Sequence, residues 1–486
     1  MSTSTIQPQE TQRSRASREQ NDTIAAIATP PGIGGVGIVR ISGPDAYAIG
    51  LRVFQRPSAA RHEPLESHLL TYGHIVDPAS GEVIDEVLAA YMRAPRTYTR
   101  EDVVEIHTHG GPLLLRRVLH LVLASGARAA NPGEMTLRAF LNGRLDLAQA
   151  EAVMSLINAE TDAGRRLAMR QLQGELSERV EAIRATIMAA VARIEASIDF
   201  PEEEVPEPDI AELRDLTRRA LADAQRLLAT AGRGRAVREG IRIAIVGRPN
   251  VGKSSLLNAL LRVNRAIVTA IAGTTRDTVE ERAVLGGMAV HLIDTAGLTT
   301  TDDPVERAGV ERSREAARSA DLLLLVLDSS EPLNDMDREA ADELERLVGE
   351  NDLTHAPVVA VLNKSDLPSV LYEREAETLP RVSRVIHASA VTPDGVAALE
   401  HVIAELIVGG EAQAGDVAIA SARHEDALRR TEDSLGEVEH GLDERVPLDL
   451  ISIDLREALA ALGEITGETA TEDILDRIFS EFCIGK

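Results

Sequence analysis

A phosphate-binding loop constrains this chain more than any other stretch. Gly247–Ser254 reads Gly-Arg-Pro-Asn-Val-Gly-Lys-Ser, which fits the pattern G-x-x-x-x-G-K-[ST]. Residues 241–246 are apolar and β-branched and predict a buried strand, and residues 255–261 predict a helix. In this order, glycines let backbone N–H groups close around phosphate oxygens, and the helix N-terminus adds its dipole. The alternative is a glycine turn that merely joins a strand to a helix.

Two further motifs each follow a predicted strand and weigh against that alternative. Residues 294–297 read Asp-Thr-Ala-Gly, where the Asp294 carboxylate can hold the Mg²⁺ shell and the Gly297 N–H can contact a terminal phosphate. Residues 363–366 read Asn-Lys-Ser-Asp, and the Asp366 carboxylate can accept both N1–H and N2–H of guanine, which adenine does not offer. Three motifs in this order, at the carboxyl ends of strands, predict a GTPase.

The rest of the chain predicts several domains. Residues 241–408 alternate strands and helices, which indicates a doubly wound, mostly parallel sheet. Helical periodicity covers 145–198, with breaks expected near Gly164 and Gly174, and continues over 209–230 and 418–482. Residues 232–235, Gly-Arg-Gly-Arg, suggest a hinge. The simplest architecture inserts the nucleotide domain into a helical domain, and the alternative is two separate helical regions.

The N-terminal part is an α/β mixture rich in predicted strands. These strands cover 23–29, 36–42, 69–76, 82–92 and 102–108, and a helix is expected over 112–123. Gly32, Gly34 and Gly37 fit G-x-G-x-x-G, but a strand follows and no acidic residue lies about twenty positions on. We therefore expect a glycine turn that lets backbone approach closely. The expected boundaries are a disordered leader at 1–20 and domains at 21–141, 142–236, 237–410 and 411–486.

Composition narrows the classes of function. The 486 residues carry 52 basic and 78 acidic side chains, a net charge of −26, so the chain as a whole attracts nucleic acid poorly. If RNA is the substrate, a local basic patch or a partner must supply the contacts. A single cysteine excludes an internal disulfide framework and fits a reducing cytoplasm. No run of eighteen apolar residues occurs, so we expect no membrane span.

Further segments reveal a family resemblance. Asn250, residues 273–277 (Gly-Thr-Thr-Arg-Asp) and residues 482–486 (Phe-Cys-Ile-Gly-Lys) together resemble the MnmE (TrmE) family of tRNA modification GTPases. Residues 29–32, 35–43 and 145–152 match this family too, so the resemblance covers the chain from about Asn21. It implies an N-terminal α+β folate-binding domain that dimerises, a discontinuous helical domain, and an inserted Ras-like G domain.

The resemblance implies how GTP is hydrolysed. Leu298 stands where Ras-type enzymes place a water-orienting Gln, and the family uses a K⁺ ion with dimerised nucleotide domains. The implied K⁺ ligands are Asn250, Thr269, Ile271 and Thr274, and the implied Mg²⁺ ligands are Ser254 and Thr275. Glu306 would orient or activate the attacking water, and its alternative is an ordinary carboxylate on a surface helix.

The implied catalytic set is therefore Glu306, Asn250 and Lys253, with Cys483 as a further candidate. The full nucleotide-binding set is Gly247, Asn250, Val251, Gly252, Lys253, Ser254, Ser255, Thr269, Ala270, Ile271, Ala272, Gly273, Thr274, Thr275, Asp294, Thr295, Ala296, Gly297, Asn363, Lys364, Asp366, Ser389 and Ala390. Ser389-Ala390-Val391 departs from the usual SAK or SAR form, which should keep the backbone contact to the base.

A folate site is the second implied site. Arg40, Glu105, Arg144 and Lys486 would contact methylene-tetrahydrofolate, for which 5-formyl-tetrahydrofolate is an analogue. The family often has Lys at the position of Arg144, and often Arg at the position of Ile33. Cys483 would lie near the folate, where a catalytic thiol needs a lowered pKa. Gly485 and Lys486 argue against prenylation of this cysteine.

The implied partners complete the expectation. A homodimer would form a heterotetramer-type complex with an FAD-dependent protein, MnmG (GidA), and modify carbon 5 of the wobble uridine of tRNA. The product carries an aminomethyl or a carboxymethylaminomethyl group, with ammonium or glycine as the amine donor. The alternative is a GTP-switched ribosome-assembly factor of the Era type. That class carries a basic RNA-binding appendage such as a KH domain, whereas the C-terminal segment here is helical and acidic and lacks a basic G-x-x-G loop.

Overall fold

The computed structural model describes residues 22–57, 64–199, 209–264, 280–294, 314–315, 317–349, 356–408 and 419–485. The contacts divide the chain into two compact units. The first holds the chain up to Met154 together with Gly463–Lys486, and the second holds Ser155–Leu462. The C-terminal segment therefore folds with the N-terminal part of the chain.

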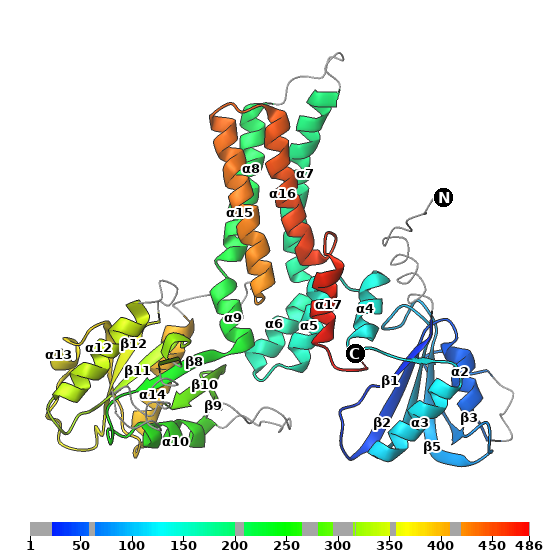
Figure 1. Cartoon of the computed structure of the whole chain (residues 1–486), viewed down its shortest axis with the longest axis horizontal. Helices are drawn as coiled ribbons and strands as arrows, with labels where there is room; N and C mark the ends of the chain where they lie inside the picture. The colour runs from blue at the N-terminus through cyan, green and yellow to red at the C-terminus, as the bar shows by residue number, and fades with distance from the viewer. Residues whose placement is uncertain are drawn as a thin grey trace, which may run out of the picture. The chain divides into compact units, whose positions relative to one another are not determined.

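A seven-stranded sheet with the order β3-β4-β5-β6-β2-β1-β7 forms the first unit. Its strands pair antiparallel except at β1 and β7. Helices α2 (Ala46–Val53) and α3 (Pro112–Ala124) pack on the sheet over a buried apolar cluster (Figure 1). The strands are β1 (Ile24–Ile27), β2 (Gly34–Ser42), β3 (Phe54–Gln55), β4 (Leu70–Val76), β5 (Val83–Met92), β6 (Val103–Gly110) and β7 (Arg128–Ala129). The strands and the helix predicted for this part of the chain are confirmed.

The glycine-rich segment that was predicted as a turn lies partly within β2, which contains Gly34 and Gly37. The predicted close approach is present, because a Cβ atom on Gly37 would lie 2.6 Å from the Leu115 side chain of α3. The strand begins at Gly34, two residues before the predicted start. No helix opens from this loop, in agreement with the rejection of a dinucleotide site.

The C-terminal helix α17 (Glu472–Ser480) packs within the first unit against α4 (Glu134–Leu141). The ring centroids of Phe140 and Phe479 lie 6.4 Å apart, and those of Phe479 and Phe482 lie 5.5 Å apart. Beyond α17, Ile484 forms an antiparallel bridge with Pro132. Helix α5 (Leu147–Ile157) leaves this unit and leads into the second one.

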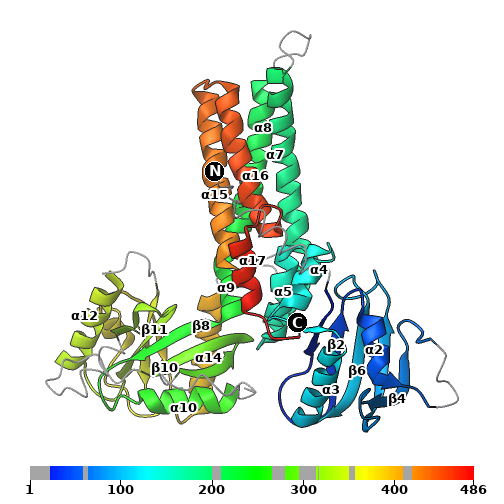
Figure 2. The same ribbon diagram turned by 45° about the vertical axis from the view of Figure 1, so that its right-hand side comes forward.

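Helices from both sides of the nucleotide-binding segment form one bundle in the second unit. Helix α8 (Ile210–Leu228) packs on α15 (Ala422–Asp443), and α7 (Glu175–Asp199) lies along α8 and α16 (Leu448–Thr466) (Figure 2). Polar bonds join α8 to α15, at Arg214–Asp443 (2.6 Å), Arg218–Glu439 (2.6 Å) and Gln225–Glu432 (2.9 Å). This packing confirms a discontinuous helical domain rather than two separate helical regions.

The predicted break near Gly164 is present but lies a few residues earlier, at 158–161 between α5 and α6 (Asp162–Leu172). Gly164 itself is in the first turn of α6, where its N–H donates to the Thr161 hydroxyl that caps the helix (3.0 Å). One local prediction for the helices is wrong. The predicted hinge at 232–235 is part of helix α9 (Ala231–Glu239). A Cβ on Gly234 would lie 1.9 Å from the Ile419 carbonyl oxygen, so this glycine serves close packing rather than bending. The predicted break at Gly174 is confirmed.

A six-stranded sheet with the order β13-β12-β11-β8-β10-β9 forms the nucleotide-binding part. Only β9 and β10 pair antiparallel, which confirms a doubly wound, mostly parallel sheet. Strand β9 was not predicted, because its first three residues, Glu-Glu-Arg, are charged. The strands are β8 (Ile241–Val246), β9 (Glu280–Leu285), β10 (Met288–Asp294), β11 (Leu322–Asp328), β12 (Val358–Asn363) and β13 (Val382–His387).

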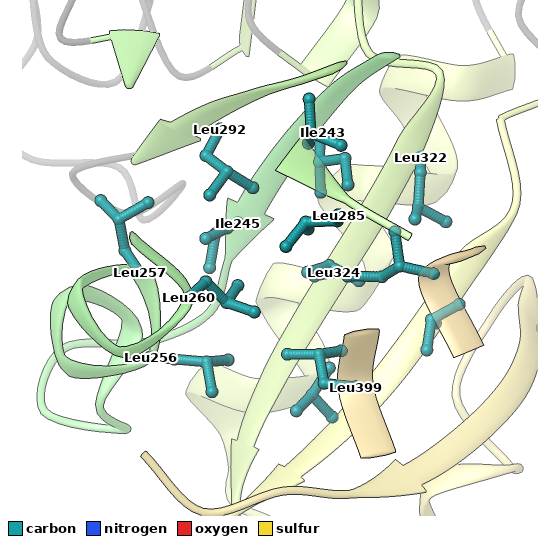
Figure 3. Packing of buried hydrophobic residues seen from close by; sticks show 14 of the residues in the cluster. Ile243, Ile245, Leu256, Leu257, Leu260, Leu285, Leu292, Leu322, Leu324 and Leu399 are labelled. Carbon is teal, nitrogen blue, oxygen red and sulfur yellow. The ribbon is translucent and has the colours of Figure 1, made fainter. Parts of the chain in front are cut away.

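Helices cover both faces of this sheet, as a parallel sheet requires. On one face α10 (Lys253–Asn264) and α14 (Pro393–Val408) contribute Leu256, Leu260 and Leu399, which pack on the apolar side chains of β8 and β11 (Figure 3). On the other face α12 (Asp335–Gly349) and α13 (Glu373–Ala376) cover a second buried cluster. The carboxyl ends of the parallel strands are thereby fixed at one edge, where the predicted nucleotide residues lie.

None of the helices in the described ranges is both long enough and apolar enough to cross a bilayer.

Candidate functional site

The phosphate loop follows β8 and leads into α10. The φ angles of the phosphate loop are positive at Gly247 (151°), Asn250 (66°) and Gly252 (98°). Glycine adopts positive φ readily, and asparagine does so more often than most other residues. Lys253 opens α10, and its ammonium donates to the carbonyl oxygens of Gly247 (2.7 Å) and Arg248 (2.9 Å). Burial lowers the pKa of Lys253. The Lys253 ammonium is therefore fixed next to a backbone loop whose conformation can surround a phosphate.

A hydroxyl and a carboxylate meet beside the loop. The Ser254 hydroxyl donates to Oδ2 of Asp294 at 2.9 Å, and Asp294 is the last residue of β10. Ser254 is a predicted Mg²⁺ ligand and Asp294 is predicted to hold the Mg²⁺ shell, and the two come from segments 40 positions apart in the sequence. Oxygen donors of this kind suit a hard divalent cation.

The strand ends on the other side of the loop carry the predicted base-reading residues. Asn363, the last residue of β12, is 2 % exposed and its Nδ2 donates to the Val251 carbonyl (2.8 Å). Its buried Oδ1 has no partner among the described residues. Asp366 accepts a hydrogen bond from the Ser389 hydroxyl (2.6 Å), which fixes the orientation of the carboxylate. One edge of the sheet therefore brings together the phosphate loop, Asn363 and Asp366.

A second cluster of charged side chains lies on the sheet of the first unit. Arg40 of β2 pairs with Glu105 of β6 at 2.8 Å, and both side chains are less than one-fifth exposed. Arg40 also donates to the carbonyl oxygen of Gly485 (3.3 Å), so the C-terminal segment ends beside this pair. His107 lies 3.4 Å from the other oxygen of Glu105. Cys483 is exposed nearby in the chain, two residues before Gly485.

Arg144 joins this cluster through an aromatic ring. Its guanidinium lies 5.0 Å from the ring centre of Tyr98, a cation–π distance, and it donates to the Thr97 carbonyl (3.0 Å). Burial raises the pKa of Tyr98, and its bond to Thr136 and the charges of Arg144 and Arg40 oppose that shift. The positive charges of both arginines thus act to lower the pKa of the same tyrosine, against the effect of burial. Three of the four predicted folate residues are brought together around Tyr98 and the C-terminus.

The structure does not extend to every predicted residue. Outside the described ranges lie Thr269, Ala270, Ile271, Ala272, Gly273, Thr274, Thr275, Thr295, Ala296, Gly297, Glu306 and Lys486. Their roles stay predictions, as do the predicted domain boundaries.

Comparison with known proteins decides the family. A family model described as "GTP-binding protein TrmE N-terminus" matches residues 23–144, and one described as "MnmE helical domain" matches residues 147–483. A curated relative from Geobacillus kaustophilus, named "tRNA modification GTPase MnmE", is 46 % identical over 96 % of this chain and 99 % of its own. One of the same name from Chloroflexus aurantiacus is 51 % identical over 96 % of this chain and all of its own.

The chain belongs to the MnmE family of tRNA modification GTPases. It is therefore an enzyme of the GTPase class. Among solved structures, it is similar to the G domain of the T. maritima FeoB iron transporter at 26 % identity, covering 34 % of this chain and 97 % of that one. The TM-score of that match is 0.26, so the assignment rests on the family models and the curated relatives. Membership of the MnmE family favours tRNA modification over the ribosome-assembly alternative.

Sequence reasoning missed some residues of this MnmE-family site. Asp328 ends β11, is 3 % exposed in its side chain and accepts from the Lys364 ammonium (2.5 Å). A carboxylate at a strand end was the signal used for Asp294, and it also marks Asp328. Arg248 pairs with Glu331 and Asp337, 83 and 89 residues away, and no local pattern shows such a contact. Tyr98 can be assigned to the folate cluster only from its contact with Arg144 in the structure.

Proposed function

We propose that this MnmE-family GTPase is activated by K⁺ and works with the FAD-dependent protein MnmG (GidA) on carbon 5 of the tRNA wobble uridine. Methylene-tetrahydrofolate would supply the one-carbon unit, and the product would carry an aminomethyl or carboxymethylaminomethyl group. A tRNA substrate would place the protein in the cytoplasm. The proposal rests mainly on one observation. This chain of the MnmE family contains two clusters of hydrogen-bonded polar side chains, one at the sheet edge near Asp366 and one around Arg40.

Selection of GTP is supported by the geometry at Asp366. One of its oxygens accepts from Ser389, which leaves acceptor capacity for the N1–H and N2–H of guanine. The buried, unpartnered Oδ1 of Asn363 offers a further acceptor close to the phosphate loop. An orphaned buried acceptor is costly in a folded protein, so a ligand at this edge would satisfy it.

The donor set fits the two proposed cations. Ser254 and Asp294 would contribute to the Mg²⁺ shell with Thr275, and Asn250 would hold K⁺ with Thr269, Ile271 and Thr274. Both ions would offset negative charge that develops on the phosphates during hydrolysis. Leu298 in place of a glutamine gives the reason for a second cation, because a leucine side chain cannot orient water. Glu306 is the proposed group that orients or activates the water.

The Arg40 cluster suits a folate. The Glu105 carboxylate can accept neighbouring N–H groups of a pterin ring, and arginines such as Arg144 bind the carboxylates of a glutamyl tail. The carbonyl of Gly485 lies against Arg40, which supports a role for the adjacent Lys486 and leaves Cys483 as a candidate thiol near the same ligand. Arg144 retains the cation that the family often supplies with lysine, and its fork also stacks on Tyr98.

The open face of the first sheet supports the proposed homodimer. Leu70, Tyr72 and Leu88 are 57 %, 45 % and 41 % exposed, and Tyr72 lies opposite Leu88 in the register of β4 and β5. The alternate residues Gly73, Ile75 and Val87 point to the buried side. An apolar strip of this kind on a sheet face favours pairing with a second copy.

Two experiments test the proposal. GTP hydrolysis is measured in K⁺ and in Na⁺ buffer, for the wild type and for Asn250→Ala, which should bind nucleotide but lose the K⁺ stimulation. Equal rates of the wild type in the two buffers would rule out activation by K⁺. Retention on immobilised tetrahydrofolate tests the other cluster, with Arg40→Ala as the weakened variant. A folded wild type that is not retained would remove the folate from the proposal.

A further inference from the structure

Arg248, the second residue of the phosphate loop, is held by two carboxylates. Its Nε donates to Oδ1 of Asp337 at 3.1 Å, and one terminal nitrogen donates to Glu331 at 2.6 Å. The Arg248 side chain is only 12 % exposed. An arginine in a phosphate loop could be expected to face the nucleotide phosphates, but these bonds commit its guanidinium to the protein.

Asp337 is a rigid anchor for this arginine. It lies in the first turn of α12 and its side chain is 4 % exposed. Its other oxygen accepts from the Asn334 N–H (3.2 Å), while its own N–H donates to the Asn334 side chain (3.1 Å). These reciprocal bonds fix the carboxylate at the start of the helix. Burial raises the pKa of Asp337, and the charge of Arg248 opposes that shift.

Glu331 differs from Asp337 in exposure, which provides an internal comparison. Its side chain is 56 % exposed, so its bond to Arg248 is screened by water. The buried bond to Asp337 should therefore fix the position of Arg248, and the bond to Glu331 should add little.

The backbone of Arg248 also contacts the phosphate-binding lysine. Its carbonyl oxygen accepts from the Lys253 ammonium at 2.9 Å, next to the carbonyl of Gly247. On the other side of the loop, Asn363 holds the Val251 carbonyl. The loop is thus held at two points, at Val251 by Asn363 of β12 and at Arg248 by Asp337 of α12. Lys253 contacts the backbone of Gly247 and Arg248, next to the second of these points.

We propose that Arg248, anchored on Asp337, is a positioning residue that holds the phosphate loop in its binding conformation. This inference rests on the proposed binding of guanine nucleotides. Loss of the anchor removes a contact that serves GDP and GTP alike, so both affinities fall together. An interaction equal in the ground state and the transition state changes KM and leaves kcat unaltered.

The test uses Arg248→Met, Asp337→Asn and the double variant in the full-length chain. Asparagine keeps the shape of Asp337 and its acceptor for Asn334, and methionine keeps an apolar stem. Titration with a fluorescent GDP analogue gives both the dissociation constant and the number of sites per chain. We expect each single variant to weaken binding about tenfold with one site per chain, and the double variant to be no weaker than either. The dissociation constant of Arg248→Lys should lie between those of the single variants and the wild type. Glu331→Gln is the matched control, and its dissociation constant should stay within about twofold of the wild-type value.

Several results would overturn the inference. Additive losses in the double variant would show that the two side chains act independently. Fewer sites per chain with an unchanged dissociation constant would show that the pair only supports folding. A fall in kcat at saturating GTP, without a change in KM, would assign Arg248 to the chemical step instead. If the wild type bound no GDP, the proposed function would fail, whereas normal binding by the wild type and both single variants would remove this inference alone.

Discussion

Gly252 should be a sensitive residue of the phosphate loop. It has a φ of 98°, and a Cβ atom on it would lie 2.3 Å from Nδ2 of Asn363, the atom that donates to the Val251 carbonyl. Gly252→Ala therefore strains the backbone and displaces the side chain that braces the loop. The nucleotide-free loop can shift to relieve both effects, so the cost should appear mainly when a nucleotide requires the original conformation.

The magnitude follows from two terms. A non-glycine residue at positive φ costs about 1–2 kcal/mol. Loss of the bond between Asn363 and Val251 adds about 1 kcal/mol. The sum, about 2–3 kcal/mol, corresponds to a rise of about 30- to 150-fold in the dissociation constant for GDP or GTP. Titration with a fluorescent GDP analogue measures it directly.

Gly287 provides the control for this experiment. It has a comparable φ of 82° in the turn between β9 and β10, but a Cβ there would meet nothing within 4 Å. Gly287→Ala should lower the free energy of unfolding by about 1–2 kcal/mol and leave nucleotide affinity unchanged. Our interpretation of the loop would be refuted if Gly252→Ala bound GDP within about threefold of the wild type, or if both variants lost affinity equally.

Three further predictions follow from the two clusters. Asp366→Asn should weaken GTP binding and favour xanthosine triphosphate, because an amide can donate to the oxygen that replaces the guanine amino group; competition between the two nucleotides measures this. Arg144→Ala should weaken retention on immobilised tetrahydrofolate more than Arg144→Lys, since lysine keeps the charge and loses only the fork that stacks on Tyr98; equal losses would contradict the proposed charge contact. Burial raises the pKa of Asp328, but the bonds from Lys364 and Ser330 outweigh it and hold that pKa below the ordinary value of an aspartate. Its stabilising effect is complete above the unfolded pKa and is lost as the pH falls through the lower folded pKa, so Lys364→Met should shift acid unfolding to higher pH, as followed by circular dichroism.

Much of the fold could be predicted because its signals are local. Short apolar runs such as 241–246 and 322–327 became β8 and β11 with nearly the predicted bounds. The error at Gly234 arose because glycine can either bend a chain or allow two backbones to pack closely. Gly234 was predicted to bend the chain, but it lies inside α9 because the backbone near Ile419 leaves no space for a side chain. That contact joins distant segments, and the sequence around Gly234 does not encode it.

The candidate site was predictable to the extent that motifs mark strand ends. The phosphate loop, Asp294 and Asn363 lie at one edge because parallel strands place their carboxyl ends together. The supporting contacts were not predictable, because they join segments with no pattern in common. Arg248 meets Asp337 across 89 residues, and Arg40 meets Gly485 across 445. The role of Arg144 was predicted from the family resemblance, but its contact with Tyr98 comes only from the fold.

One measurement tests the central claim most directly, namely that GTP hydrolysis by this chain serves one-carbon transfer to tRNA. The purified chain and its FAD-dependent partner are incubated with wobble-uridine tRNA, an amine donor, GTP, K⁺ and methylene-tetrahydrofolate that carries an isotope in its methylene group. We predict that the isotope enters the tRNA, and that Asp366→Asn and Arg40→Ala each abolish this transfer. Transfer that proceeds equally without GTP, or tRNA that remains unlabelled while GTP is hydrolysed at its full rate, would contradict the account.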